Sequence, residues 1–193
     1  MSSLAVPKIS VEQYLAIDRD AEVKSEFHEG EMFPVDSVTL EHAAIVANTT
    51  WRVAEQLSVT PCQVLSQPLR VRVSVARFVY ADLLVVCGRP ELTDEVRDTI
   101  TNPKVIIEVL SPSTEGYDYG PKFGFYRKLP SFAEYLLIRQ DQAKVEVFRK
   151  SEGAGWTLST YEGLDATVPV QSIGINLRLS DLYSGVEFPA LAE

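Results

Sequence analysis

The sequence predicts a mixed α/β fold in which helices pack on a central sheet. Residues 39 to about 61 place apolar side chains at helical spacing, which indicates one long helix. Residues 80–87 and 104–110 are nearly continuous apolar runs of strand length, as expected for strands covered on both faces. With 193 residues, 46% of them hydrophobic and 23% charged, the chain has an ordinary globular composition and is expected to form a single domain.

Short-range signals predict the elements that precede the apolar runs. The segment Ser10-Val11-Glu12-Gln13 has the form of a capping box, so a short helix is expected from residue 11 to about 17. Residues 26–35 are predicted to form a hairpin with Glu29 and Gly30 at its tight turn. Two strands are expected between the long helix and the first apolar run, at residues 63–65 and 69–75.

A loop rich in Ser, Pro, Gly and Thr follows the second apolar run and leads to a predicted helix from about residue 119 to 128. Gly120 and Pro121 fit the first turn of a helix but not its interior, so we expect this helix to begin at Asp118 or Tyr119. The elements expected after it are strands at 133–139, 144–149 and 156–161 and a closing helical turn at 180–183.

The net charge of −9 argues against nonspecific coating of nucleic acid, because phosphate neutralisation needs clustered Lys and Arg. Residues 99–150 have a positive balance, with 8 basic against 6 acidic side chains. No apolar run approaches the roughly 18–20 residues that cross a bilayer, and the amino terminus does not resemble a secretory signal. Cys62 and Cys87 lie in apolar surroundings and are expected to be reduced core cysteines of a cytoplasmic protein.

Two carboxylates occupy strands that are expected to be buried. Asp82 lies near the start of the first apolar run, and Glu108 lies in the middle of the second. An ionised carboxylate in such a strand costs several kcal/mol unless a cation or strong donors compensate it. Mg²⁺ prefers one or two carboxylates together with waters and phosphate oxygens, so an ion between the two would remove the cost. The alternative is that each carboxylate faces solvent at a sheet edge or pairs with an arginine.

The helix predicted after these strands presents polar residues on one face. Asp118, Lys122 and Tyr126 follow one another at a spacing of four residues. Phosphodiester hydrolysis needs a metal ion that holds the phosphate and a cation near the attacking water or the developing charge. Lys122 suits the second role, although an ordinary Asp–Lys surface pair also explains the spacing.

These residues resemble a known family. Ala81-Asp82, Glu108-Val-Leu-Ser-Pro-Ser-Thr, and Asp118 followed by Lys122 and Tyr126 look like the bacterial restriction endonuclease family often called the Uma family. That family belongs to the PD-(D/E)XK nuclease superfamily. The resemblance covers roughly residues 10–150, and its further matches are the 26–35 hairpin, Glu41-His42 and Glu134-Tyr135.

The resemblance implies a restriction-endonuclease-like fold, with a mixed central sheet flanked by helices. A nuclease-like core would span about 10–150, and a carboxy-terminal strand and turn extension would span 151–193. It also implies that Asp82 and Glu108 bind Mg²⁺ or Mn²⁺. Ala81 replaces the usual proline, and Leu110 stands where the superfamily has its lysine; in this family that lysine has moved to the following helix, where Lys122 stands.

Several other residues are candidates for accessory roles. Glu41 and His42 at the start of the long helix, and Tyr126, are candidates to reach the same pocket, although a polar contact at the helix start is the plainer interpretation of His42. Ser111 and Ser113 are candidates to cap their loop or to contact phosphate, and capping is the plainer interpretation. The candidates for gripping backbone phosphates are Arg70, Arg72, Arg77 and Lys128.

Our first functional hypothesis is a cytoplasmic, Mg²⁺-dependent endonuclease that hydrolyses DNA as a homodimer and has no membrane partner. An alternative is a nucleic-acid-binding or regulatory module that keeps the fold without cutting, which the net charge and the lack of a base-reading element favour. A third is a protein-interaction subunit. Its motive is the acidic region 151–193, with the aromatic residues Trp156, Tyr161, Tyr183 and Phe188.

Overall fold

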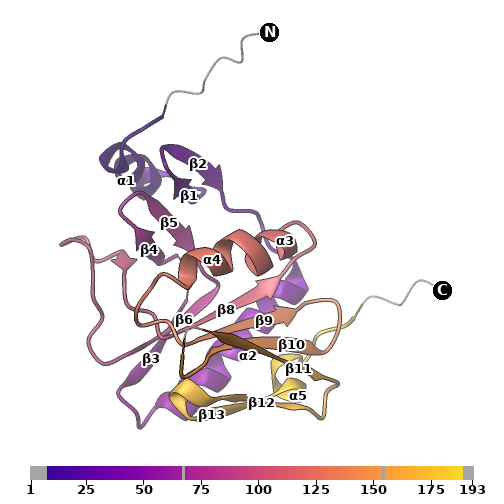
Figure 1. Cartoon of the computed structure of the whole chain (residues 1–193). Helices are drawn as coiled ribbons and strands as arrows, with labels where there is room; N and C mark the ends of the chain where they lie inside the picture. Colours follow the sequence, from indigo (N-terminus) through magenta and orange to yellow (C-terminus); the bar gives the residue numbers. More distant parts are fainter. Residues whose placement is uncertain (1–7, 67, 154, 189–193) are drawn as a thin grey trace.

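The computed structural model describes residues 8–66, 68–153 and 155–188 (Figure 1). The helices are α1 (Val11–Asp20), α2 (Leu40–Leu57), α3 (Glu115–Tyr117), the π-helical η1 (Asp118–Lys122), α4 (Phe123–Tyr126), the 3-10 helix η2 (Gln171–Ile173) and α5 (Leu179–Leu182). The strands are β1 (Ser25–His28), β2 (Glu31–Pro34), β3 (Cys62–Ser66), β4 (Arg70–Ser74), β5 (Arg77–Tyr80), β6 (Leu83–Cys87), β7 (Thr99–Ile100), β8 (Val105–Leu110), β9 (Glu134–Arg139), β10 (Lys144–Lys150), β11 (Trp156–Glu162), β12 (Thr167–Val170) and β13 (Ile175–Arg178). No helix within the described ranges is long and apolar enough to cross a membrane.

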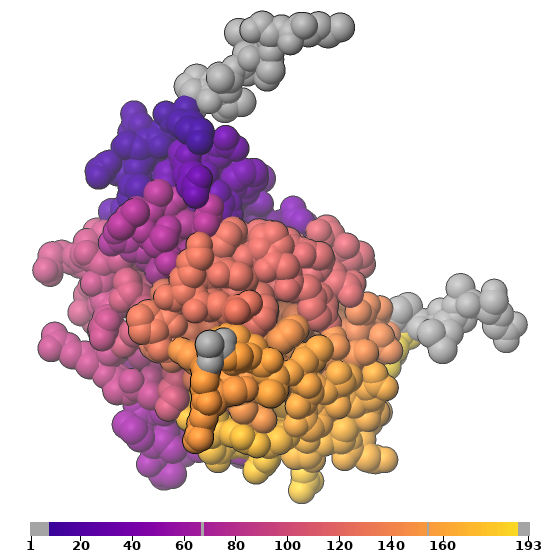
Figure 2. Space-filling view, in the orientation of Figure 1, coloured from indigo at the N-terminus to yellow at the C-terminus, as the bar shows by residue number. Residues whose placement is uncertain are grey.

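The larger sheet has six strands in the order β11-β10-β9-β8-β6-β3. Its neighbouring strands are antiparallel except for β8 and β9, which run parallel, so the sheet is mixed. Helix α2 lies behind this sheet, and the turns of α3, η1 and α4 lie in front of it (Figure 1). In the space-filling view these turns occupy the middle of the visible face (Figure 2). The predicted arrangement of a mixed central sheet flanked by helices is confirmed.

Strand β8 is buried on both faces, as its apolar sequence predicted. Val105 and Ile107 belong to the core beneath α2, whereas Ile106 and Leu110 belong to the core beneath α4. Successive side chains of a strand point to opposite faces, so Glu108 lies on the same face as Ile106 and Leu110. The alternation therefore directs the Glu108 carboxylate toward the helical turns that carry Lys122.

The smaller sheet has five strands in the order β2-β1-β5-β4-β7. Phe27 of β1 and Phe78 of β5 pack on Tyr14 of α1, with ring centroids 4.7 and 5.5 Å from the Tyr14 ring. The side chains next to Phe27 and Phe78 along each strand point to the opposite face of the sheet. One face of this sheet is therefore a small core, and the other is left for polar side chains.

The chain passes from the smaller sheet to the larger one within the apolar run at 80–87. The prediction of one continuous strand there was wrong, because β5 ends at Tyr80 and β6 begins at Leu83. Asp82 lies at this crossing, next to the place where the two sheets meet.

The helical turns after β8 begin earlier than predicted. Elements α3, η1 and α4 follow one another without interruption over residues 115–126. A start at Asp118 or Tyr119 was wrong, because Gly120 and Pro121 lie inside the π-helical segment and not in a first turn. Such a segment changes the backbone spacing ahead of a proline, whose ring clashes with the carbonyl four residues earlier in a regular α-helix.

Cys62 and Cys87 form a disulfide, so the prediction of two reduced core cysteines was wrong. The two residues are paired in the antiparallel register of β3 and β6, with their Cα atoms 3.9 Å apart. Sequence spacing alone does not show which strands become neighbours. The disulfide joins the edge strand β3 to the rest of the larger sheet.

The aromatic residues near the carboxy terminus pack within the protein. Tyr183 is buried, and its ring centroid lies 5.2 Å from that of Phe188. Trp156 packs edge-on against Phe123 of α4, with centroids 5.2 Å apart. These contacts remove much of the motive for a protein-interaction subunit, since the aromatic side chains stabilise the core of this chain.

Arg70 lies inside the protein, with 3% of its side chain exposed. Its guanidinium pairs with Asp18 of α1, at 2.6 Å from Nη1 to Oδ2, and with Asp98. The Tyr80 hydroxyl also donates to Asp18, at 2.6 Å. A role for Arg70 in gripping phosphate does not fit this position, because its hydrogen bonds are used to hold α1 on the smaller sheet.

The Asp98 carboxylate makes part of the stability of the protein dependent on pH. Burial raises the pKa of Asp98, but hydrogen bonds from Arg19 and Arg70 outweigh burial and hold the pKa well below its ordinary value of about 3.9. A lowered folded-state pKa stabilises the protein above the unfolded-state pKa, and this stabilisation is lost as pH falls through the folded-state value. We expect the free energy of unfolding of the wild type to fall more steeply between about pH 5 and pH 2 than that of Asp98→Asn.

Urea unfolding at a series of pH values measures this difference. At pH 7 we expect Asp98→Asn to lose about 1.5–3 kcal/mol, the range for hydrogen bonds to charged groups. Asp94→Asn is the matched control, because Asp94 is a more exposed carboxylate that also pairs with Arg19. Parallel pH profiles for the wild type and Asp98→Asn would contradict the prediction.

Candidate active site

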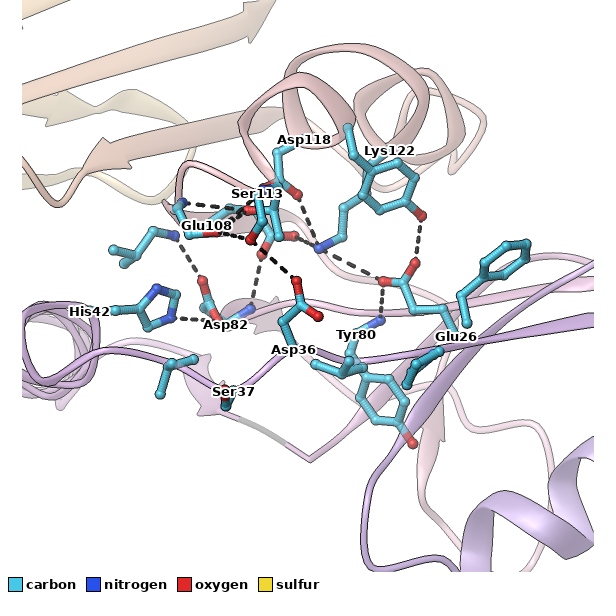
Figure 3. Close-up of a pocket in the computed structure, with 18 of the residues that line it drawn as sticks. Glu26, Asp36, Ser37, His42, Tyr80, Asp82, Glu108, Ser113, Asp118 and Lys122 are labelled. Carbon is cyan, nitrogen blue, oxygen red and sulfur yellow. Dashed lines mark hydrogen bonds and ion pairs between the residues drawn. The ribbon is translucent and has the colours of Figure 1, made fainter.

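A cavity of about 690 Å³ opens where the two sheets meet. Strand β1, the loop before α2, the crossing from β5 to β6, the end of β8 and the turns of α3 and η1 contribute its walls. Figure 3 shows His42 reaching in from α2 on one side and Glu26 from the opposite side, with Asp82, Glu108 and Lys122 between them. Residues far apart in the sequence therefore share one cavity.

Asp82 and Glu108 lie side by side at the floor of this cavity. The backbone N–H of Asp82 donates to Glu108 Oε2 at 3.2 Å, and the backbone N–H of Val109 donates to Asp82 Oδ2 at 2.8 Å. Leu83 pairs with Ile107 in the antiparallel register of β6 and β8, so the next step along both strands places Asp82 opposite Glu108. The strands themselves thus bring the two predicted carboxylates together.

Lys122 lies within reach of three carboxylates. Its Nζ is 2.9 Å from Glu108 Oε1, 3.3 Å from Asp118 Oδ1 and 3.8 Å from Glu26 Oε1. The four-residue spacing places Asp118 and Lys122 on one helical face, as the sequence predicted, but the pair is buried and not on the surface. The structure therefore brings Asp82, Glu108 and Lys122 into one cluster.

The charges in this cluster shift the pKa values of its members. Burial raises the pKa of Glu108 well above its ordinary value, and the nearby charges of Asp118 and Asp82 add to the shift against the opposing effect of Lys122. Burial alone would lower the pKa of Lys122, but the carboxylates of Glu108, Asp118 and Glu26 raise it well above its ordinary value. Lys122 is therefore a cation, and the Glu108 carboxyl group is costly to ionise unless a further cation compensates its charge.

Of the three predicted accessory residues, His42 and Tyr126 contact the carboxylate pair. The His42 ring lines the cavity, and its Nε2 is 3.2 Å from Asp82 Oδ1. The backbone N–H of His42 donates to Thr39, which caps α2, so the helix start orients the ring. The Tyr126 hydroxyl donates to Glu108 Oε1 at 2.9 Å. Glu41 is not among the described residues that line the cavity.

The loop after β8 has the capping arrangement that was expected. The Ser111 hydroxyl accepts from the backbone N–H of Thr114 at 3.2 Å and lies 3.0 Å from the Ser113 hydroxyl. Ser113 in turn donates to Asp36 at 3.2 Å, which links this loop to the loop before α2. The loop therefore holds one edge of the cavity.

Sequence reasoning missed Glu26 as a member of the site. Its Oε1 accepts the backbone N–H of Tyr80 at 3.1 Å, and its Oε2 accepts from the Tyr117 hydroxyl and lies 3.2 Å from His28 Nε2. Burial raises the pKa of Glu26, but the charge of Lys122 and these hydrogen bonds outweigh it and lower the pKa. The available signal was local: Glu26 and His28 flank Phe27, so they share the face of β1 that is not apolar.

The donor set fits a hard divalent cation. No three or more His, Cys, Asp or Glu side chains in the described part of the chain are arranged as a ready metal centre. Asp82 and Glu108 are adjacent buried carboxylates, however, in a cluster where carboxylates outnumber cations. Mg²⁺ uses one or two protein carboxylates and completes its coordination with waters and phosphate oxygens. Two carboxylates without a third protein ligand match that preference.

The candidate phosphate contacts are scattered. Arg77 lines the cavity, where its Nε is 3.1 Å from His28 Nδ1 and its Nη2 is 2.9 Å from Glu29 Oε1. Arg72 and Lys128 are not among the described residues that line it. Of the four residues predicted to grip phosphate, Arg77 is the one that the structure places at the cavity.

Comparison with known proteins identifies the family. The sequence model of the Uma2 family, described as "Putative restriction endonuclease", matches residues 11–180. This chain belongs to the Uma2 family. The resemblance inferred from the sequence is confirmed, and the match continues past residue 150 into the carboxy-terminal hairpin.

Relatives of this Uma2 chain include two cyanobacterial proteins. The uncharacterized protein sll1609 of Synechocystis sp. is 32% identical over 170 residues, which cover 87% of this chain and 96% of its own. The uncharacterized protein slr1290 of the same organism is 27% identical over 187 residues, which cover 96% and 97%.

A solved structure has the same fold as this chain. The crystal structure of "a putative nuclease belonging to DUF820" from Anabaena variabilis has a TM-score of 0.75 to the Uma2 chain, at 20% sequence identity. The match covers 93% of this chain and 99% of that one. The predicted fold class is therefore confirmed.

Proposed function

We propose that this Uma2 protein is a metal-dependent endonuclease that hydrolyses phosphodiester bonds in DNA. One observation carries the proposal: Asp82 and Glu108 lie side by side in one cavity, with Lys122 Nζ 2.9 Å from Glu108 Oε1. Phosphodiester hydrolysis needs a metal ion and a fixed positive charge near the phosphate. The carboxylate pair can hold the ion, and the Lys122 ammonium supplies the charge.

Asp82 and Glu108 would hold Mg²⁺ or Mn²⁺. When bound, such an ion supplies Lewis acidity and lowers the pKa of a coordinated water. Lys122 places its ammonium beside the carboxylates, where it stabilises negative charge that develops on the phosphate. Asp118 and Glu26 hold that ammonium in place, at 3.3 and 3.8 Å.

Neighbouring groups keep the two carboxylates in one orientation. The backbone N–H of Val109 binds one oxygen of Asp82, and His42 Nε2 lies beside the other. The hydroxyl of Tyr126 binds Glu108 Oε1. We therefore assign Tyr126 and His42 to positioning the carboxylates.

Plasmid cleavage in Mg²⁺ and in Mn²⁺, with EDTA as the metal-free control, tests the proposal. We expect nicking or linearisation that requires the ion and that falls by more than about 100-fold in Asp82→Asn, because even the outer partners of metal ligands contribute about 10–100-fold. The exposed Asp165→Asn, outside the cavity, is the matched control and should cleave as the wild type does.

Wild-type cleavage by Asp82→Asn would show that the assigned site is wrong. Metal-independent DNA binding without cleavage, retained in Asp82→Asn, would favour the module that binds nucleic acid without cutting.

We further propose that the protein acts in the cytoplasm and as a homodimer. Cellular DNA is accessible there, and two symmetric copies suit the cutting of two strands. The Cys62–Cys87 disulfide is unusual for that compartment. Fractionation of native cells with thiol counting tests the location, and size-exclusion chromatography at micromolar concentration tests the dimer; a monomer elution volume would contradict the dimer.

A further inference from the structure

The cavity has an aromatic wall, formed by His28, Phe33, Tyr117 and Phe125. The centroid of the His28 ring lies 5.2 Å from that of Phe33, 5.5 Å from that of Phe125 and 6.1 Å from that of Tyr117. His28 and Tyr117 both contact the Glu26 carboxylate, which faces Lys122. The aromatic wall is therefore continuous with the acidic cluster.

Strand pairing explains why Phe33 faces the cavity. In the antiparallel register of β1 and β2, Glu26 is opposite Phe33, and directly opposite residues share a face of the sheet. The neighbouring Phe27 points to the other face, where it packs on Tyr14. Phe33 is 45% exposed, so its ring serves the cavity and contributes little to the core.

Cations are scarce among the described residues that line the cavity. Arg77 and Lys122 are both engaged: Arg77 contacts Glu29 and lies 4.0 Å above the Phe125 ring, and Lys122 contacts its three carboxylates. Binding of duplex DNA through its phosphates depends on Lys and Arg that displace counterions. The carboxylates that line the same cavity are Glu26, Asp36, Asp82, Glu108 and Asp118.

The chemical cluster is also deep. Exposure is 8% for Asp82, 3% for Glu108 and 7% for Lys122. A cavity of about 690 Å³ is the size of a small-molecule site, for which about 300–1,000 Å³ is typical. Enzymes whose active-site pocket cannot be reached by a nucleotide that is still stacked in a duplex act on single strands or turn that nucleotide out of the duplex.

We propose that the aromatic wall stacks an unpaired nucleobase next to the phosphate that is cleaved. The preferred substrate is then a single-stranded or locally unpaired segment of nucleic acid. This inference rests on the proposed nuclease function and names its substrate class. Stacking on aromatic side chains is tolerant of sequence and strengthens binding by roughly 5–150-fold per base, which compensates for the shortage of cations.

Fluorescence anisotropy with labelled oligonucleotides of about 20 nucleotides tests the inference. The probes are a DNA single strand, its perfect duplex, the duplex with a short bulge, and the RNA single strand. Binding is measured in EDTA and in Ca²⁺, and gels verify that each probe remains intact. The variants are Phe33→Ala, Phe33→Trp and the control Leu158→Ala, whose side chain is 51% exposed on β11 outside the cavity.

We expect the single strand and the bulged duplex to bind at least tenfold more tightly than the perfect duplex. Phe33→Ala should weaken binding of the single strand by at least about fivefold, and Phe33→Trp should restore it. A 2-aminopurine in the bound strand should lose fluorescence on binding to the wild type and regain it in Phe33→Ala, a readout of stacking that a purely structural role would not change. Comparing the affinities for the DNA and the RNA single strand shows which of the two nucleic acids supplies the unpaired base.

Equal affinity for the single strand and the perfect duplex, or an unchanged affinity in Phe33→Ala, would each overturn the inference. In that case metal-dependent plasmid cleavage that requires Asp82 would still support the nuclease. If every probe fails to bind in both conditions and none is cleaved in Mg²⁺ or Mn²⁺, the nuclease proposal is wrong together with this inference.

Discussion

Glu108→Gln is expected to lower metal-dependent cleavage by more than about 100-fold while leaving the protein close to the wild type in stability. The glutamine keeps the shape of the side chain and an oxygen that accepts from Tyr126. Its amide nitrogen cannot accept from the Asp82 N–H as Glu108 Oε2 does, and the side chain loses the charge that would hold the ion. Titration calorimetry with Mn²⁺ measures the loss of metal binding, and plasmid cleavage measures the loss of activity.

The stability of Glu108→Gln follows from the charge balance of the cavity. Burial, with the nearby carboxylates of Asp118 and Asp82, raises the pKa of Glu108, so the ionised side chain opposes folding at neutral pH. Removing it leaves Lys122 paired with Asp118 and Glu26. The removed buried charge offsets the lost hydrogen bond from the Asp82 N–H, so we expect the free energy of unfolding in urea at pH 7 to stay within about 1.5 kcal/mol of the wild-type value.

Glu134→Gln is the matched control, because Glu134 is a fully buried glutamate on the adjacent strand β9. Its oxygens accept from Arg149 Nε at 2.6 Å and from the backbone N–H groups of Gln171 and Ser172 at 3.1 and 2.7 Å. Its replacement should lower stability and leave cleavage by the folded protein intact. A Glu108→Gln protein that cleaves normally would show that Glu108 has no part in the chemistry.

Lys122→Met is expected to lower cleavage by about 100–1,000-fold, the range for losing one fixed group that stabilises developing charge. It should also destabilise the protein by about 3–5 kcal/mol, because buried carboxylates lose their shared cation. Plasmid cleavage and urea unfolding measure the two effects. Lys144→Met is the control, since Lys144 pairs with the exposed Glu162 outside the cavity.

Lys122→Arg separates the two effects of Lys122. It keeps the positive charge, so the protein should fold even where Lys122→Met does not. Its planar guanidinium cannot occupy the position of the compact ammonium, so cleavage should stay below that of the wild type. Full cleavage by either variant would contradict the role assigned to Lys122.

Much of the fold could be predicted because its signals are local. The capping box at Ser10 and Gln13 forms as expected, and α2 occupies the segment whose apolar residues recur at helical spacing. Strand β8 follows from its continuous apolar run. The disulfide and the crossing at Asp82 could not be predicted, because both depend on which strands become neighbours.

The sequence by itself determined which side chains are chemically unusual. Asp82 and Glu108 stand out because a carboxylate in an apolar strand is costly to bury, and the helical spacing alone places Lys122 on one face with Asp118. Only the tertiary structure decided which side chains meet. It brought Glu26 of the smaller sheet to Lys122 of η1 and placed Arg70 in an interior ion pair, because strand pairing and sheet packing depend on contacts between residues that are distant in the chain.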